Sequence, residues 1–376
     1  MPWQTKDTIS MRDEFVNKAL SGNYTISYLC SEFKISRKTG YKWIERFKNY
    51  GADGLINHSN RPQISINRTA GDIIEMILST RDKFPAWGAR KLRQYLINKG
   101  YDQVPSEITF NRVLKKHGRI DPVESEKRQP FIRFEKDKPN ELWQMDFKGY
   151  FKMGSKRCHP LTVLDDHSRF SIVLKACESE TFIAVRSGLE NAFREYGLPE
   201  AMTMDNGSPW KGSPPWTLSK LTVWLMRLGI KVNHSSVRHP QTQGKDERFH
   251  RSLKEEVLRF HQFRNLEDTQ SILDDWRRIY NFERPHEGIG LLCPYQRYKH
   301  SSRPYLEKLP TIEYKAEDIV RKVQACGCIN YRDIRYFVGE HLTGEHVAIR
   351  LTSEEGVYGI YFVNTKVARI NIKNMN

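Results

Sequence analysis

The chain has 376 residues, a formal net charge of +16 and a mean hydropathy of −0.66. This length predicts two to four domains. No apolar run reaches the roughly 18 residues of a membrane span, and the first residues lack the apolar core of a secretory signal. We therefore expect a soluble protein of the cytoplasm.

The positive charge is concentrated in the first third of the chain. Residues 1–134 hold 24 Lys and Arg against 14 Asp and Glu, a net charge of +10. Such an excess is typical of proteins that bind polyanions, although a solvated basic surface explains it too. The six cysteines include no Cys-x-x-Cys pair and hence no zinc-finger spacing. Cys326-Gly-Cys328 is a weak metal or redox signal, and free thiols in a reducing cytosol are the simpler interpretation.

Residues 1–60 are predicted to form three helices, over 11–20, 25–33 and 37–48. Ser36 fits the N-cap of the third helix, in which Tyr41, Ile44 and Phe47 recur at helical spacing. A short turn between the second and third helices is the helix-turn-helix pattern. The third helix would then enter the major groove of DNA. Its candidate DNA-binding residues are Arg37, Lys38, Thr39 and Lys42. A helical bundle without a ligand is the alternative.

Residues 61–118 are predicted to form a second helical, helix-turn-helix-like unit. Amphipathic patterns cover 70–79 and 89–98, and Ser106 fits the N-cap of a helix over 107–117 that carries Ile108, Val113 and Leu114. The surface of this unit is basic, which favours a second DNA-binding domain. A spacer domain without a ligand is the alternative. Residues 119–140 are charged and interrupted by prolines, and are predicted to be a linker.

Strand and helix patterns alternate from residue 141 onward, which predicts an α/β domain over 141–305. Its expected strands are 142–153, 159–164, 170–176, 201–204 and 230–233. Its expected helices are 181–196, 218–228, 244–263 and 266–280. Short strands at intervals of about 11 residues then predict a small antiparallel all-β barrel or sandwich over residues 314–376.

Three acidic residues stand at positions where strand ends and a helix start can converge. Asp146 lies in an apolar strand, Asp205 directly follows another, and Glu247 opens a long helix. Carboxylate oxygens are the ligands that Mg²⁺ prefers, and two such ions about 4 Å apart promote phosphoryl transfer. Each residue also has an ordinary explanation. Asp146 could be a solvent-facing carboxylate of a strand, and Asp205 could cap the turn that follows it. Glu247 could be an acid in the first turn of a helix, where the helix dipole favours it.

Other polar residues near these acids are assigned by position. Asp165 and Asp166 are interpreted as a hairpin turn, and Asp246 is expected to point about 100° away from Glu247 on the helix. Arg251 and Lys254 follow Glu247 by four and seven residues, on the same face, and are candidate DNA contacts. His239 and Gln243 either position DNA or have a structural role in their loop, and Arg284 and His286 are assigned to structural bracing.

The ordered motifs resemble the integrase-core transposases of the Asp-Asp-Glu type, found in bacterial insertion sequences and related to retroviral integrases. The matching segments are Trp143-Gln-Met-Asp146, Asp165-Asp-His-Ser-Arg169, Met204-Asp-Asn-Gly207, His239-Pro-Gln-Thr-Gln-Gly-Lys-Asp-Glu247 and Tyr280-Asn-Phe-Glu-Arg-Pro-His286. One departure is the 41-residue separation of Asp205 and Glu247, which exceeds the usual spacing and suggests a longer loop around 208–216.

The resemblance implies a multidomain protein with a ribonuclease H-like α/β core between the helix-turn-helix units and the C-terminal barrel. It implies that Asp146, Asp205 and Glu247 are the catalytic residues and the ligands of two Mg²⁺ ions, replaceable by Mn²⁺. The implied activity is cleavage at transposon ends and transfer of the 3′-OH into target DNA, by a homo-multimer on double-stranded DNA. A nuclease of the same fold and a non-catalytic DNA-binding regulator are the alternatives.

Overall fold

The computed structural model describes residues 7–57, 69–120, 135–205, 207, 210, 218–234, 244–309 and 311–371. The chain divides into two compact units, Met1–Thr69 and Ala70–Asn376. Within the described ranges, no helix is both long and apolar enough to cross a membrane. Most of the predicted linker, residues 121–134, lies outside the described residues.

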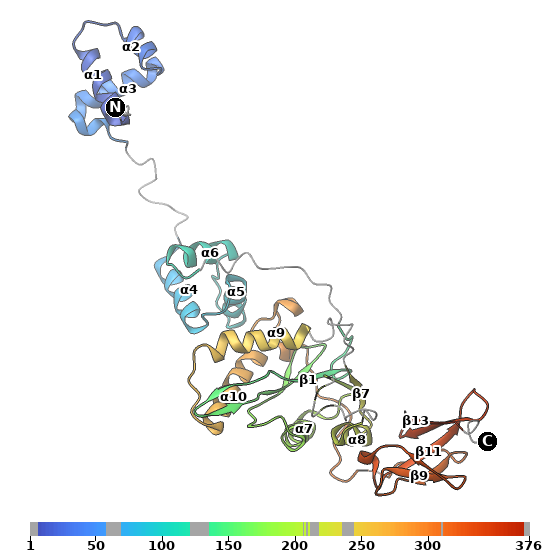
Figure 1. Ribbon diagram of the computed structural model, residues 1–376. Coiled ribbons are helices and arrows are strands. Elements are labelled where there is room, and N and C mark those ends of the chain that lie inside the picture. Colours follow the sequence, from blue (N-terminus) through green and yellow to red (C-terminus); the bar gives the residue numbers. More distant parts are fainter. Residues whose placement is uncertain are drawn as a thin grey trace. The chain divides into compact units, whose positions relative to one another are not determined.

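The first unit is built from α1 (Thr8–Leu20), α2 (Ile26–Glu32) and α3 (Arg37–Tyr50), followed by a 3₁₀ turn at Gly51–Leu55 (Figure 1). The side chain of Ser36 accepts a hydrogen bond from the backbone N–H of Thr39 at 3.2 Å, so the predicted N-cap is confirmed. Lys34 has a φ of 53°, the left-handed conformation that closes the turn between α2 and α3.

The inward face of α3 differs from the predicted stripe. Trp43 and Ile44 are buried, whereas Tyr41 is 56 % exposed, so its assignment to the core is wrong. The reason is the close approach of α3 at Gly40. A Cβ there would stand 2.7 Å from Cys30 Sγ and 2.9 Å from Phe15. With Gly40 at the point of contact, the neighbouring Tyr41 is rotated toward solvent.

Gly54 is expected to be intolerant of any side chain. A Cβ at this position would stand 2.3 Å from the backbone carbonyl oxygen of Arg46, which cannot move as a side chain can. We expect Gly54→Ala to destabilise the first unit by about 1–3 kcal/mol. Hydrogen–deuterium exchange of the full chain should then accelerate over α1–α3 and stay unchanged over residues 70–120. Equal exchange over α1–α3 in both proteins would contradict this.

The second unit begins with α4 (Gly71–Lys83), α5 (Ala89–Asn98) and α6 (Glu107–Lys116). Ser106 caps α6 by accepting the Thr109 N–H at 3.4 Å, as predicted. Phe110, Val113 and Leu114 face the core of this helical part. Ile108, which was predicted to pack with them, is 80 % exposed. These three residues already fill the inward face of α6, and Ile108 lies on the opposite side.

The central sheet has the order β5-β4-β1-β6-β7. These strands are β1 (Trp143–Phe147), β4 (Leu161–Asp165), β5 (Ser171–Lys175), β6 (Ala201–Met204) and β7 (Lys231–His234). β5, β4 and β1 are antiparallel, whereas β1, β6 and β7 are parallel, so the sheet is mixed. The first predicted strand is in fact two elements, because β2 (Phe151–Met153) leaves the sheet and pairs with β3 (Lys156–Cys158) as a separate hairpin.

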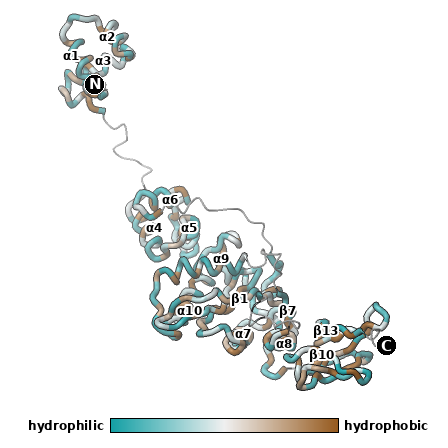
Figure 2. The backbone as a smooth tube through the Cα atoms, in the orientation of Figure 1, coloured by the Kyte–Doolittle hydropathy of each residue, from teal (hydrophilic) through white to brown (hydrophobic). Residues whose placement is uncertain are grey.

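Helices cover both faces of the central sheet. α7 (Phe182–Tyr196) and α8 (Lys220–Arg227) pack on the face that receives Trp143, Met145 and Phe147. α9 (Gly244–Leu253) and α10 (Leu266–Phe282) share a core with side chains of the other face. Figure 2 shows hydrophobic residues among hydrophilic ones along α10, as amphipathic packing requires. Because side chains alternate along a strand, Gln144 and Asp146 lie on the α9 side.

The long helix predicted over 244–263 stops being regular after ten residues. α9 passes into a π-helical turn at Lys254–Leu258. Within this turn, Glu256 is drawn inward, where its carboxylate accepts hydrogen bonds from Arg284 and from Trp276 Nε1. π-helical segments are rare and occur mostly as single turns within α-helices, frequently at functional sites.

The C-terminal part is an antiparallel β structure, as predicted. A four-stranded sheet has the order β13-β12-β11-β8, and β9 pairs with β10 as a hairpin. The strands are β8 (Ile319–Lys322), β9 (Cys328–Tyr331), β10 (Ile334–Phe337), β11 (His346–Leu351), β12 (Val357–Phe362) and β13 (Thr365–Asn371). Val223 and Met226 of α8 belong to its hydrophobic core. Closure into a barrel stays a prediction.

Candidate active site

Asp146 lies near the end of the central strand β1, on the face that α9 covers. Its side chain is 30 % exposed. Burial raises the pKa of its carboxyl group to about 7, and the negative charges of Asp205, Glu180 and Glu247 add to this effect. A carboxyl group held this far from its usual range, among other carboxylates, is characteristic of functional sites.

Asp205 and Glu247 approach Asp146 from two other elements. Asp205 directly follows β6, which runs parallel to β1, so the two acids lie at the same edge of the sheet. Glu247 is in the first turn of α9. Both are exposed. Among the residues that the structure describes, however, no three Asp, Glu, His or Cys side chains are grouped closely enough to hold a metal ion. The assignment of the three acids as ligands therefore stays a prediction.

Asp246, not Glu247, is the buried acid of α9. It is 3 % exposed, and burial raises the pKa of its carboxyl group well above the usual value, with further contributions from the charges of Asp146 and Asp166. The expectation that Asp246 points away from the site is wrong. Asp246, Phe249 and Leu253 form the inward row of the helix, and this row leaves Glu247 at the exposed edge.

Two residues that the sequence analysis missed hold Asp146 in place. Thr162, opposite Asp146 on β4, donates its hydroxyl proton to the Asp146 carbonyl oxygen at 2.9 Å. The hydroxyl therefore accepts from His250 Nε2, also at 2.9 Å. His250 Nδ1 is then unprotonated and faces Asp146 Oδ2 at 4.0 Å. Burial lowers the pKa of His250 to about 4, so the ring is neutral at physiological pH.

Basic side chains border the acidic group. Arg251 and Lys254 are exposed on α9 and the π turn. Lys148 follows β1 directly. Burial lowers the pKa of Lys148, and the charge of Lys254 lowers it further, so the two ammonium groups lie near each other. Of the other predicted residues, His239 and Gln243 lie outside the described residues. Arg284 and His286 are buried, and His286 Nε2 is 3.2 Å from the Tyr280 hydroxyl, which agrees with bracing.

The predicted DNA-binding residues of the first unit all lie at the start of α3. Arg37, Lys38 and Lys42 are exposed. Thr39 is half-buried, and its hydroxyl is 2.9 Å from Ser36 Oγ, so it takes part in the N-cap. Their contact with DNA stays a prediction.

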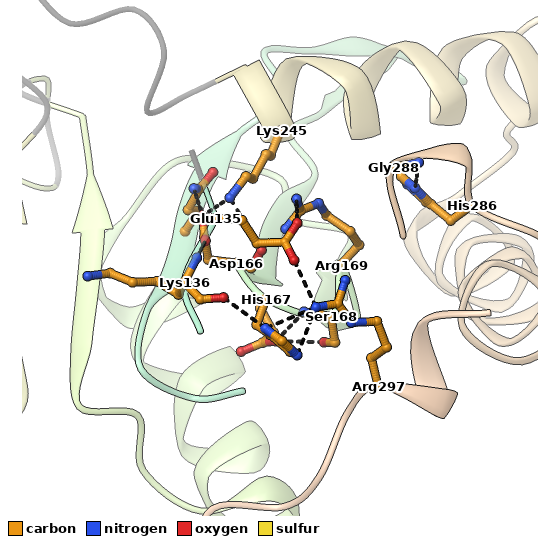
Figure 3. Close-up of polar contacts among 12 residues, drawn as sticks. Glu135, Lys136, Asp166, His167, Ser168, Arg169, Lys245, His286, Gly288 and Arg297 are labelled. Carbon is orange, nitrogen blue, oxygen red and sulfur yellow. Dashed lines mark hydrogen bonds and ion pairs between the residues drawn. The ribbon is translucent and has the colours of Figure 1, made fainter. Parts of the chain in front are cut away.

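The turn between β4 and β5 is a buried polar network (Figure 3). Asp165 accepts hydrogen bonds from the Asn140 N–H at 2.7 Å and from the hydroxyl and N–H of Ser168 at 2.6 and 2.8 Å. Asp166 accepts from the Lys136 N–H at 2.8 Å and from Gln144 Nε2 at 2.6 Å. It also forms an ion pair with Lys245. The hairpin turn predicted for Asp165 and Asp166 is confirmed.

Five family models match segments of the chain. Two models named integrase core domain match residues 136–240 and 228–294. A helix-turn-helix domain model matches residues 11–63, and a homeodomain-like domain model matches residues 39–114. The model of the IS481 family transposase C-terminal domain matches residues 318–376.

The individual relatives include two proteins of insertion elements. An insertion element IS407 protein of Burkholderia multivorans is 28 % identical, over 42 % of this chain and 54 % of its own length. An insertion element IS476 protein of Xanthomonas euvesicatoria is 30 % identical, over 42 % of this chain and 44 % of its own length. The chain thus spans about half the length of these curated relatives. A solved HTLV-2 integrase catalytic core domain, in complex with magnesium, is 18 % identical with a TM-score of 0.33, over 43 % of this chain and 97 % of that one.

The matched segments, taken in chain order, define an integrase-core protein with helix-turn-helix domains. The chain is similar to proteins of insertion elements over its integrase core, and its C-terminal segment matches the model of the IS481 family transposase C-terminal domain.

Proposed function

We propose that this protein cleaves DNA at the ends of its element and transfers the resulting 3′-OH into target DNA in a metal-dependent reaction. One observation carries the proposal. On the central strand of an integrase-core sheet, burial and three neighbouring carboxylates raise the pKa of Asp146 to about 7. A carboxyl group with this surplus of negative charge around it is suited to a divalent cation rather than to a structural role.

The atoms around Asp146 include carboxylate and amide oxygens, the ligands that a hard divalent cation prefers. Two buried oxygen atoms, Gln144 Oε1 and Asp246 Oδ1, lack a hydrogen-bond donor in the part of the chain that the structure describes. Such atoms are costly unless a partner compensates them. We assign Asp146, Asp205 and Glu247 as the residues that would hold Mg²⁺ or Mn²⁺. The bound cation would lower the pKa of water and stabilise charge on the phosphate.

The protein's own groups would bind and orient the DNA. The exposed cations of Arg251 and Lys254, with Lys148 beside them, are placed to neutralise phosphate oxygens near the acids. The neutral ring of His250 keeps the strand end that carries Asp146 tied to Thr162. No nucleophilic side chain is needed, because positioning and charge neutralisation carry such reactions. We place the reaction in the bacterial cytoplasm, on double-stranded DNA, in a multimer that bridges two ends.

The experiment that tests the proposal is a joining assay with the full-length protein. Linear fragments of the genomic DNA that flanks its gene are incubated with supercoiled plasmid and Mg²⁺, and the junctions are sequenced. We expect all junctions to begin at one cleaved position within the flanking DNA, which is joined to the plasmid by its 3′ end. Cleavage without joining would favour a nuclease of the same fold. Binding without either reaction would favour a DNA-binding regulator.

The start of α3 is expected to supply end recognition. Replacing Arg37 and Lys42 together with alanine should weaken binding to end DNA by at least about tenfold at moderate salt, because base-edge and phosphate contacts each contribute on the order of 1 kcal/mol or more. The dependence of affinity on salt should also become shallower, since fewer counterions are released. Titrations at several salt concentrations measure both effects.

Lys48→Ala is the matched control for this pair, because Lys48 is an exposed lysine at the other end of the same helix. Its removal should change affinity little. The pair removes two positive charges and the control removes one, so a control that lost half of the binding free energy lost by the pair would show that α3 acts only through its overall charge.

A further inference from the structure

The carboxylate of Asp166 lies at the meeting point of three segments that are distant in sequence. Asp166 is 1 % exposed. Its Oδ1 accepts from Gln144 Nε2 of β1 at 2.6 Å and forms the ion pair with Lys245 of α9. Its Oδ2 accepts from the Lys136 N–H at 2.8 Å. Figure 3 shows Lys245 reaching down from the start of α9 to this carboxylate.

The two connections made by Oδ1 both reach elements that carry candidate acids. Gln144 precedes Asp146 by two residues on β1, and Lys245 precedes Glu247 by two residues on α9. One oxygen atom therefore links the strand that carries Asp146 to the helix that carries Glu247. The Asp166 backbone adds to this link, because its N–H donates to the Leu142 carbonyl at 2.9 Å and its carbonyl accepts from Lys245 Nζ at 3.3 Å.

The link is sensitive to the loss of either partner. Asp166 is buried and the Lys245 side chain is 14 % exposed, so neither charge can be solvated by water if the other is removed. An asparagine at position 166 would offer one acceptor oxygen where three donors converge, and its amide group would face another donor. The start of α9 would then have to move away from β1.

We propose that Asp166 and Lys245 are a positioning pair that sets the separation of β1 and α9, and with it the separation of Asp146 and Glu247. The inference rests on the proposed function, since it concerns the same acidic group. Neither residue touches the reacting atoms. Asp166 and Lys245 act by positioning Asp146 and Glu247.

The test compares Asp166→Asn and Lys245→Met with Asp318→Asn and Arg350→Met in the full-length protein. The control pair is matched, because the side chain of Asp318 is 2 % exposed and accepts hydrogen bonds from Arg350 at 2.7 and 2.8 Å within the C-terminal part. The readout is the rise in melting temperature as MnCl₂ is titrated into DNA-free protein. A second readout is the Mn²⁺ concentration at half-maximal joining.

We expect Asp166→Asn and Lys245→Met to require at least about tenfold more Mn²⁺ than wild type for half of the thermal shift, in line with the loss of groups that orient metal ligands. The controls should lower the melting temperature but keep the wild-type Mn²⁺ midpoint. Lys245→Arg retains the charge and the donors, and should restore the midpoint at least in part.

The outcomes separate the inference from the proposed function. A wild-type protein without any Mn²⁺-dependent thermal shift would overturn the metal site, and the positioning pair with it. A second outcome is a thermal shift in the wild type together with the same Mn²⁺ midpoint in Lys245→Met and Arg350→Met. That result would overturn the positioning pair alone. If Asp166→Asn does not fold, Lys245→Met and Lys245→Arg decide the question by the same midpoints.

Discussion

Asp146→Asn is expected to abolish metal-dependent cleavage and joining, with a loss of at least about 1000-fold, which corresponds to roughly 4 kcal/mol of transition-state stabilisation. The substitution keeps the volume of the side chain and removes only its ability to carry negative charge. DNA binding through the helix-turn-helix unit should persist. The measurement is the joining assay beside a binding titration, and activity near the wild-type rate would remove Asp146 from the site.

The same substitution is expected to stabilise the metal-free protein at high pH. Burial raises the pKa of Asp146 from 3.8 to about 7 in the folded protein. The folded state therefore holds a proton that the unfolded state has lost, and wild-type stability falls as pH rises from about 4 to about 7. The increase in the free energy of unfolding caused by Asp146→Asn should be absent near pH 4 and reach at most about 4 kcal/mol above pH 7.

Urea unfolding at pH 4.5 and pH 8, in the presence of EDTA, measures this difference. Asp102→Asn is the control, because Asp102 is exposed and lies outside the acidic group around Asp146, and its unfolding should show no such gain. Equal unfolding midpoints of wild type and Asp146→Asn at pH 8 would contradict the raised pKa.

Glu256→Gln is expected to destabilise the second unit by about 3–5 kcal/mol, because it leaves a buried guanidinium without its counter-charge. Arg284 donates to Glu256 from Nε at 2.9 Å and from its terminal nitrogen at 2.8 Å, and the two side chains are only 5 % and 9 % exposed. Burial raises the pKa of Glu256, but the charge and hydrogen bonds of Arg284 outweigh it and the pKa is lowered.

The contribution of Glu256 should therefore be complete above about pH 4.5 and be lost as pH falls through its lowered pKa. Urea unfolding of the full chain at neutral and acid pH measures it. Glu178→Gln is the control, because Glu178 pairs with Lys156 in an exposed ion pair and its removal should leave the midpoint unchanged. A Glu256→Gln midpoint equal to that of Glu178→Gln would show that the buried pair contributes nothing net.

Local signals predicted local structure well. Ser36 and Ser106 were identified as N-caps, and both cap as predicted, because a capping side chain acts within three residues of itself. Errors arose where packing decides which face of a helix turns inward. Tyr41 is exposed because Gly40 makes the close contact of α3, and no pattern within the helix reports the position of Phe15 and Cys30.

The orientation of α9 was partly available from the sequence. Phe249, Leu253 and Val257 recur at intervals of four, and extending this row backward reaches position 245 or 246 rather than 247. The motif alone favoured Glu247 as the inward residue. The ion pair of Asp166 with Lys245 joins positions 79 residues apart, and the contact of Thr162 with His250 joins positions 88 apart. Neither has a local signature, so only the folded chain reveals them.

The π turn at Lys254–Leu258 determines where this part of the chain tolerates a change in length. A π turn holds one residue more than an α turn, so loss of Glu255 leaves enough residues to close an ordinary α-helix between α9 and the segment that follows. Loss of a residue within α9 has no such reserve. It would rotate the helix start by about 100° relative to the rest, moving Asp246 to the place of Glu247 and Lys245 to the place of Asp246 against β1.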